Sequence, residues 1–294
     1  MKLIAPTEIT EARLISSTVP ENDYGVWDVA TSYPAGSCVV KGHRIWTSVQ
    51  DLNTGRDPQT AAAGWWVDSG PTNRWAMFDK TVGTRTRASE TMTITLAPGR
   101  ADSIALLQVD AAEVTITQRV GATIITQRTI SLIERAGIVD WFDYFFDPIR
   151  SADFVAITDL PVYGESTIDI TFTKNDGEVS CGVCVVGLQT DLGITRVSPT
   201  VGINDYSKKT TDDFGNTSLV RRDYSKRMSL RLVVDNRDID RVRSLIAEQR
   251  ATPVVWVGDS GYSSLIVYGW FRDFELDIAY ATVSYFTLNI EGMI

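Results

Sequence analysis

The stretch TMTITLAPGRADSIALLQVDAAEVTITQRV, residues 91–120, determines the fold class of this chain. In TMTITL the apolar residues alternate with threonine, which places Met92, Ile94 and Leu96 on one face of a strand. A Pro-Gly turn follows, and SIALLQVD and EVTITQRV continue as further strands. Several short strands separated by turn residues predict a β-sandwich, which we expect to occupy residues 84–187.

The chain after this sandwich, residues 188–294, predicts a C-terminal β domain with one α-helix. In DNRDIDRVRSLIAEQRATP, residues 235–253, the apolar side chains recur at helical spacing and Pro253 stops the pattern, so we expect a helix near residues 236–250. The apolar residues of this helix are Ile239, Val242, Leu245 and Ile246. The strands PVVWVGD, SLIVYGWF and TVSYFTLNI follow, and we expect the helix to cover one face of their sheet.

The chain before the sandwich has a different pattern of apolar and turn-forming residues. Residues 23–80 consist of short apolar runs separated by Gly, Pro, Asn and Asp, which indicates a small β module rich in turns. Residues 1–22 show no sustained period, and we expect an arm that leads into the fold or docks on a neighbour. The predicted fold class is therefore mostly β, with a small β module, a β-sandwich and a C-terminal β domain that carries one helix.

Five of the eight tryptophans lie in the first 80 residues. A domain of about 60 residues buries too little of its surface to be stable without large side chains, so most of these rings are expected to fill a core. If Trp65 and Trp66 share one strand, however, their side chains point to opposite faces, and one of them is exposed. An exposed indole could stack on a sugar ring or dock against a neighbouring subunit. The candidate contact residues are Tyr33, Trp46, Trp65 and Trp66.

The segment TNRWAMFDK, residues 72–80, carries a further tryptophan. In a strand, Trp75 and Met77 would share one face and Ala76 and Phe78 the other, so the segment would be buried on both sides. This pattern favours a strap that packs the small module onto the sandwich rather than a ligand site.

No catalytic device can be recognised in the sequence. His43 is the only histidine, no G-x-S-x-G motif is present, and no glycine-rich phosphate loop lies between a strand and a helix. Carboxylate pairs suited to a glycan hydrolase could be nominated, but acidic loop residues are usually solvated surface. We therefore predict no enzyme activity, no cofactor and no metal site, with a glycan hydrolase that uses middle-domain carboxylates as the alternative. The nominated pairs are Asp212 with Asp213 and Asp143 with Asp147.

The three cysteines, Cys38, Cys181 and Cys184, include one C-x-x-C pair. This pair lies in a β-rich run, where residues three apart point to opposite faces, and no second Cys or His pair completes a metal site. We therefore expect buried structural cysteines.

Charge and hydropathy limit the possible partners. Lys and Arg total 28 against 37 Asp and Glu, which gives a net charge of −9, and no basic stripe is present, so nucleic acid is not expected as a partner. MKLIAPTEIT is too short in its apolar run for a secretory signal, and no stretch reaches the length of a membrane span. We expect synthesis as a soluble cytoplasmic product.

A resemblance covers about a fifth of the chain. YPAGSCV, GHRIWTS, NTGRDP and the pair Trp65-Trp66, taken in this order, resemble the small chitin-binding type of carbohydrate-binding module found in bacterial chitinases. The chain departs from that family at Ser37, where an Asp is usual, and at Val49-Gln50, where an aromatic pair is usual. The resemblance implies a compact β fold that uses surface aromatic residues on polysaccharide.

A second resemblance covers nearly the whole chain. The stretches ISSTVPENDYGVW, VGLQTDLGITRVSPTVGINDYSKKTTDDFGN and LIVYGWFRDFEL are similar to a family encoded in the tail modules of tailed bacteriophages and prophages. It implies a virion structural protein of the distal tail or baseplate, assembled in the host cytoplasm with copies of itself and with other tail proteins. Host-surface polysaccharide is a further possible partner of its N-terminal module.

The stretch INDYSKKTTDDFGNTSLVRRDYSKR, residues 203–227, is long for a connection inside a compact domain. Its charges could pair across a subunit interface, and a solvated hairpin is an equal alternative. The basic residues concerned are Lys208, Lys209, Arg221 and Arg222.

Overall fold

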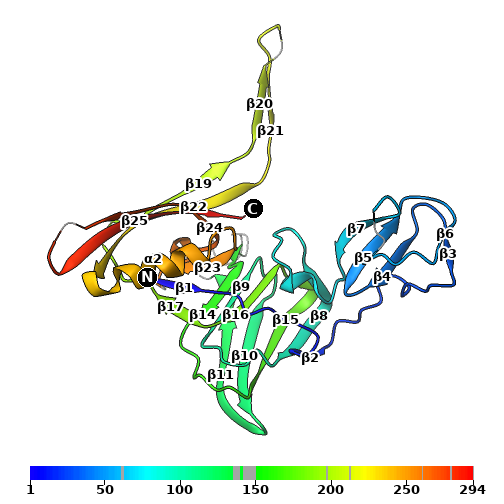
Figure 1. Ribbon diagram of the computed structural model, residues 1–294, viewed down its shortest axis with the longest axis horizontal. Coiled ribbons are helices and arrows are strands. Elements are labelled where there is room, and N and C mark those ends of the chain that lie inside the picture. The colour runs from blue at the N-terminus through cyan, green and yellow to red at the C-terminus, as the bar shows by residue number, and fades with distance from the viewer. Residues whose placement is uncertain are drawn as a thin grey trace.

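The fold, seen in a computed structural model, is mostly β, as the strand pattern predicts (Figure 1). The described part of the chain contains one α-helix and three 3₁₀ turns. The structure describes residues 1–60, 63–134, 140–141, 150–196, 198–211, 213–259, 261–278 and 280–293. The aromatic-rich sequence DWFDYFFDPIR, residues 140–150, predicts a loop or short helix, and most of it lies outside these residues.

The predicted sandwich forms from two antiparallel sheets. The larger sheet contains, in spatial order, β11 (Thr123–Ser131), β10 (Glu113–Val120), β15 (Ser166–Cys181), β8 (Thr86–Leu96) and β2 (Leu14–Ser17). The smaller sheet contains β14 (Phe154–Ile157), β9 (Ser103–Leu107) and β16 (Val183–Gly187). Met92, Ile94 and Leu96 are fully buried between them, which confirms the alternation read from TMTITL. A short pair, β12 (Ile133–Glu134) and β13 (Arg150–Ser151), lies beside the sandwich.

The C-terminal part forms an eight-stranded sheet that also contains the N-terminus of the chain. Its strands, in spatial order, are β17 (Gln189–Asp191), β1 (Lys2–Ile4), β23 (Val254–Val257), β24 (Ile266–Asp277), β25 (Val283–Gly292), β22 (Tyr224–Asp235) and β18 (Ile194–Thr195), and β19 (Thr200–Asp205) also pairs with β22. Residues 1–22 are therefore built into two sheets, because β1 joins this sheet and β2 joins the sandwich.

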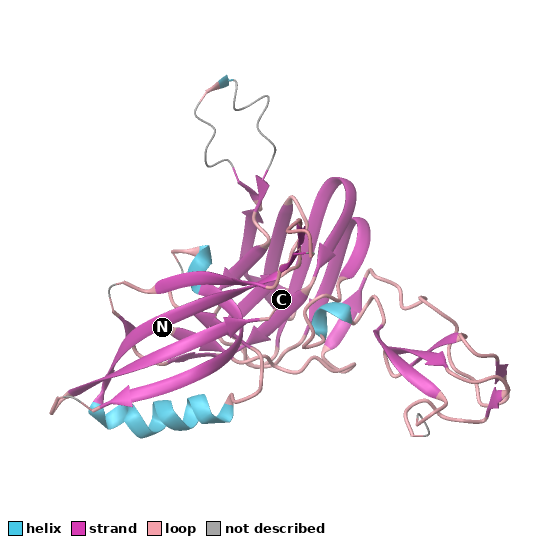
Figure 2. Cartoon of the chain, turned by 90° about the horizontal axis from the view of Figure 1, so that it is seen from above, coloured by secondary structure: helices cyan, strands magenta, loops and turns pink. Residues whose placement is uncertain are grey.

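The sheets and the helix stack in layers. Helix α2 (Ile239–Glu248) covers one face of the eight-stranded sheet (Figure 2). Its buried residues Val242 and Ile246 pack into the core between helix and sheet. The other face packs on the smaller sheet of the sandwich, where Ile4 and Tyr268 meet Ala105. The smaller sheet is thus buried on both faces. Helix α2 lies within the predicted range near 236–250, and the 3₁₀ turn η2 (Asn236–Asp238) precedes it. A further 3₁₀ turn, η3 (Ser263–Leu265), precedes β24.

The small module lies beside the sandwich (Figures 1 and 2). It consists of the pair β3 (Ser32–Tyr33) and β6 (Asn53–Thr54) and of the three-stranded sheet β4 (Cys38–Lys41), β5 (Arg44–Ser48) and β7 (Trp66–Pro71). Residues Ala76–Phe78, expected as a strand, form the 3₁₀ turn η1 instead. Trp75, Ala76 and Met77 are nevertheless all buried, and Met77 enters the core of the sandwich.

A hairpin projects from the edge of the eight-stranded sheet, away from the rest of the molecule (Figure 1). It consists of β20 (Lys208–Thr211) and β21 (Thr217–Val220), and we call these two strands the hairpin arm. Every residue of both strands is exposed.

The two cysteines of the C-x-x-C pair are both buried, but the prediction that they face opposite sides is wrong. The chain leaves β15 at Cys181 and enters β16 just after Gly182, and both thiols then lie in the core of the sandwich. The two strands belong to facing sheets, so the period of a single strand does not apply. Burial raises the pKa of the Cys184 thiol to about 12, and it raises the pKa of the Cys181 thiol as well.

No helix in the described part of the chain is long and apolar enough to cross a membrane.

Candidate functional site

The pair Trp65-Trp66 divides into a core residue and a surface residue. Trp66 is only 4% exposed, and its indole N–H donates to the carbonyl of Arg56 at 2.9 Å. Tyr33 packs edge-on against it, with 5.4 Å between ring centroids. Trp65 is partly exposed, and the Arg56 guanidinium lies 3.6 Å from its ring centroid. Trp65 is therefore the member of the pair that can meet a ligand. It lies in the turn before β7, which begins at Trp66, so the two rings do not share one strand and the alternation expected for them does not apply.

Tyr33 and Trp46, the other two candidates, are both partly buried. The Tyr33 hydroxyl accepts a hydrogen bond from the backbone N–H of Asp28 at 2.8 Å, so its polar end is already occupied. The Trp46 indole donates to the carbonyl of Lys41 at 3.1 Å and leaves part of its ring exposed. Of the four predicted contact residues, Trp66 is buried, and Tyr33, Trp46 and Trp65 are partly exposed.

Trp27 belongs to the same surface and was not among the predicted contact residues. The Lys41 ammonium lies 3.8 Å from the Trp27 ring centroid and forms an ion pair with Asp57 at 2.7 Å. Hydrogen bonding to this ammonium lowers the pKa of the Asp57 carboxyl. Because Val39 pairs with Trp46 across the sheet, Lys41 and Trp46 point to the same side. Trp27 lies upstream of the motifs that carry the carbohydrate-module resemblance, so those motifs did not mark it.

We call Trp27, Lys41 and Trp46 the aromatic face. It offers two partly exposed indoles and an ammonium group, which lies against the Trp27 ring, while the Trp46 indole is bonded to the backbone of the same lysine. Flat rings can stack on the C–H faces of sugars, and the ammonium can donate hydrogen bonds to hydroxyl groups. This combination can bind polyhydroxylated ligands at a surface.

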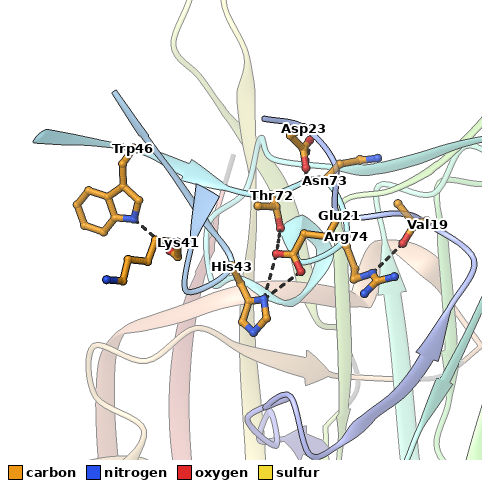
Figure 3. A network of polar contacts seen from close by, with 9 residues as sticks. All are labelled: Val19, Glu21, Asp23, Lys41, His43, Trp46, Thr72, Asn73 and Arg74. Carbon is orange, nitrogen blue, oxygen red and sulfur yellow. Dashed lines mark hydrogen bonds and ion pairs between the residues drawn. The ribbon is translucent and has the colours of Figure 1, made fainter. Parts of the chain in front are cut away.

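The single histidine lies where the small module meets the sandwich. Gly42 and His43 both have positive φ, 60° and 64°, and they form the two-residue turn between β4 and β5. This turn carries the imidazole toward Glu21, whose carboxylate lies 3.0 and 3.2 Å from Nδ1 (Figure 3). The Thr72 hydroxyl donates to the same carboxylate at 2.8 Å. The His43 ring also stacks on Trp75, with 4.2 Å between centroids.

Further hydrogen bonds hold the same junction together. The backbone N–H of Asn73 donates to Asp23, and Nε of Arg74 donates to the carbonyl of Val19 at 2.7 Å (Figure 3). The strap predicted from TNRWAMFDK therefore touches both bodies, since Trp75 stacks on the module and Met77 fills the sandwich.

The hydrogen bonds of His43 bear on the hypothesis of a nucleophilic device. Its Nδ1 is engaged by Glu21, and no serine or cysteine hydrogen-bonds to its Nε2 among those residues. Asp143, Asp147 and Asp212, which were nominated for a hydrolase, lie outside the described residues, and Asp213 is exposed. The described residues hold no group of three or more His, Cys, Asp or Glu side chains that could bind a metal ion.

Two of the cavities formed by the described residues bear on function. One, of about 410 Å³, lies between the sandwich and the eight-stranded sheet, where Leu107, Phe154 and Tyr268 line an apolar wall. Burial raises the pKa of the Tyr268 hydroxyl to about 12. The other, of about 400 Å³, lies at the junction beside His43, and we call it the junction pocket.

No protein-family model matches this chain, and no curated protein matches its sequence.

Proposed function

We propose that this chain is a structural subunit of a bacteriophage tail, in the distal tail or baseplate, that assembles with copies of itself and with other tail proteins. The resemblance of its sequence to phage and prophage tail proteins motivates the proposal. The structural observation that best supports the proposal is the hairpin arm.

The hairpin arm has the properties of an assembly element. A two-stranded hairpin is marginally stable in water, and its outer edges leave backbone N–H and C=O groups unpaired. In this arm Leu219 is 71% exposed and Val220 is 50% exposed, so apolar side chains also face solvent. Another chain that covered the arm would pair its edges and bury these side chains. The arm is therefore stabilised most where a neighbouring subunit is present.

Charge favours a second copy of the chain as that neighbour. The arm and the residue pair that follows it carry four cationic side chains, and none of them forms an ion pair within the described residues. They are Lys208, Lys209, Arg221 and Arg222. On β24 three carboxylates alternate along one exposed face of the strand. They are Asp273, Glu275 and Asp277. The basic arm of one subunit and this acidic row on the next are complementary in charge.

A charge-swap experiment tests the assembly. Mass photometry of the wild-type protein should show discrete multimers. Lys208→Glu with Lys209→Glu should give monomers, as should Asp273→Lys with Glu275→Lys, because each variant places like charges together. Mixing the two variants should restore multimers, since one reversed arm then meets one reversed row.

Arg243→Glu with Arg250→Glu, on exposed positions of helix α2 and the turn after it, is the matched control and should leave multimers unchanged. A wild-type protein that stays monomeric at micromolar concentration, alone and with neighbouring tail proteins, would contradict the proposal. Multimers that tolerate both reversals would contradict the assigned contact.

We also propose that the small module contacts host-surface glycan through the aromatic face and Trp65. The partly exposed indoles of Trp27, Trp46 and Trp65 support this role. A single ring–sugar contact is weak, but several modules on one particle can raise effective affinity by about 10² to 10⁴ when they engage together.

Pull-down on host cell-wall polysaccharide tests this contact. Trp46→Ala and Trp65→Ala should each reduce retention while the melting temperature stays nearly unchanged. Unchanged retention of a double variant would exclude both rings from binding.

A further inference from the structure

The tip of the hairpin arm carries the most exposed large apolar side chain in the described part of the chain. Phe214, between β20 and β21, is 91% exposed. Full burial of a phenylalanine ring strengthens a contact by about tenfold to a hundredfold in affinity. The arm projects away from the body of its own subunit (Figure 1), so it presents this ring to a neighbouring molecule.

The cavity between the sandwich and the eight-stranded sheet, which we call the interlayer pocket, can hold such a ring. Its volume of about 410 Å³ falls within the range of roughly 300–1,000 Å³ typical of binding pockets. Val183 and Ile266 extend the apolar wall described above. Asp223 and Tyr224 line the pocket and are both exposed, so the cavity opens at the surface. An aromatic ring that entered it would be packed as in a protein core.

Charged side chains of both signs surround the interlayer pocket. Two are cationic and two are anionic, and none of the four forms an ion pair within the described residues. They are Arg85 and Lys226, and Asp153 and Asp223. Because these charges balance, the pocket favours an occupant that is apolar at its centre and charged at its edge. The exposed Asp213, next to Phe214, can pair with Arg85 or Lys226 when the ring enters.

The interlayer pocket and the acidic row lie on the same face of β24. Tyr268 lines the pocket and faces the smaller sheet of the sandwich, whereas Phe274 packs toward helix α2. Asp273 is the neighbour of Phe274 in the strand and therefore points to the face that Tyr268 occupies. The separation in sequence from Tyr268 to Asp273 equals that from Lys209 to Phe214. A hairpin whose basic residues meet the acidic row is thus long enough to reach the pocket with its tip.

We propose that Phe214 of one subunit inserts into the interlayer pocket of the next subunit. The proposal rests on the proposed assembly through the hairpin arm and adds the site that receives the tip of the arm. The basic residues of the arm then lie against the acidic row, and the ring at the tip anchors the contact in an apolar pocket.

Dilution series followed by mass photometry on the full chain test the role of the ring. Phe214→Ala should raise the subunit dissociation constant by about tenfold to a hundredfold, because it removes the buried ring. Its melting temperature as a monomer should be unchanged, since the position is exposed. Phe214→Leu keeps an apolar side chain and should restore most of the affinity. Thr217→Ala, at another exposed position of the arm, is the matched control and should assemble like wild type.

Cysteine cross-linking tests the location of the tip. In a Cys38→Ser background both remaining native cysteines are buried. A copy with Asp213→Cys, beside the ring, and a copy with Asp223→Cys, at the pocket, carry tags of different mass. A short bismaleimide should join the two copies into one mixed product. A copy with Glu113→Cys, exposed on the sandwich, replaces the Asp223→Cys copy as the control and should give no such product.

The outcomes separate this proposal from the assembly on which it rests. If Lys208→Glu with Lys209→Glu gives monomers while Phe214→Ala assembles as tightly as wild type, the pocket assignment is overturned and assembly through the arm stands. Loss of affinity in Phe214→Ala without the mixed cross-linked product would also overturn the assignment, because the ring would then bind elsewhere. A wild-type protein that remains monomeric under all conditions would overturn both proposals.

Discussion

Trp65 and Trp66 are adjacent in sequence but differ in what they do for the fold. Trp66 fills the core of the small module, hydrogen-bonded to Arg56 and packed against Tyr33. Trp65 lies at the surface beneath the same arginine. One arginine thus contacts both rings, by its carbonyl on the inside and by its guanidinium on the outside.

Replacement of these two tryptophans should therefore affect stability unequally. Trp66→Ala removes a buried aromatic side chain and should destabilise the module by about 3–5 kcal/mol. Trp65→Ala removes a partly exposed ring and should cost about 1 kcal/mol or less. Urea unfolding followed by tryptophan fluorescence measures both. Equal losses would mean that both rings are core.

Asp79 gives the protein a pH-dependent element. Burial raises the pKa of its carboxyl, although the backbone N–H of Thr81 and the hydroxyl of Thr84 oppose the shift. A raised folded pKa stabilises the fold below the unfolded pKa, and this contribution is lost as pH rises through the folded value.

Asp79→Asn keeps an acceptor for Thr81 and Thr84 and cannot ionise. Its melting temperature relative to wild type should therefore rise from acidic to neutral pH. Asp213→Asn, at an exposed position, is the control and should give no such trend. A difference between Asp79→Asn and wild type that is constant with pH would contradict the assignment.

Strand β1 ties the N-terminus of the chain to the C-terminal sheet. Its three residues pair with β17 on one side and with β23 on the other. Leu3 faces the layer of helix α2, and Ile4 faces the smaller sheet of the sandwich. A very short strand therefore closes both cores of the C-terminal half.

Ile4→Ala should lower the free energy of unfolding by about 2–5 kcal/mol, because it opens a cavity between two packed sheets. Lys2→Ala, in the same strand, should change it by no more than about 0.5 kcal/mol. Chemical denaturation measures both variants. Similar losses would indicate that pairing of the strand, rather than packing of Ile4, carries the stabilisation.

In the whole molecule, the position of the small module depends on a few polar contacts and on the strap. Glu21 holds His43 and Thr72, and Asp23 holds the backbone of Asn73. The contacts of Glu21 with Thr72 and of Asp23 with Asn73 join residues that are 51 and 50 positions apart in the chain.

Removal of both carboxylates should release the module. Glu21→Ala with Asp23→Ala should increase the radius of gyration in small-angle X-ray scattering and speed proteolysis near the junction, while far-UV circular dichroism stays unchanged. Glu113→Ala, at an exposed position of the sandwich, is the control. An unchanged radius would show that the strap alone holds the module.

Much of the secondary structure could be predicted, because the spacing of apolar residues along a strand or helix is a local property of the sequence. The face formed by Met92, Ile94 and Leu96 and the helix around Val242 are both confirmed. The 3₁₀ turn at Ala76–Phe78 was missed, since a buried segment of that length fits a strand or a turn equally well.

The candidate site was predicted only in part. Alternation predicted that one ring of Trp65-Trp66 is buried, but the two rings do not share one strand, and the pattern did not show which one faces inward. The contact between Trp27 and Lys41 and the pairing of His43 with Glu21 join residues that share no motif, so no pattern could indicate them.

The sequence alone determined the mostly β class, the helix and the acidic net charge. Each of these depends on composition or on residues within a few positions of one another. Tertiary structure alone placed β1 between β17 and β23, put Cys181 and Cys184 in one core, and formed the junction pocket. The physical reason is that strands pair wherever a free edge and a complementary face meet in space. That choice depends on the packing of segments far apart in the chain.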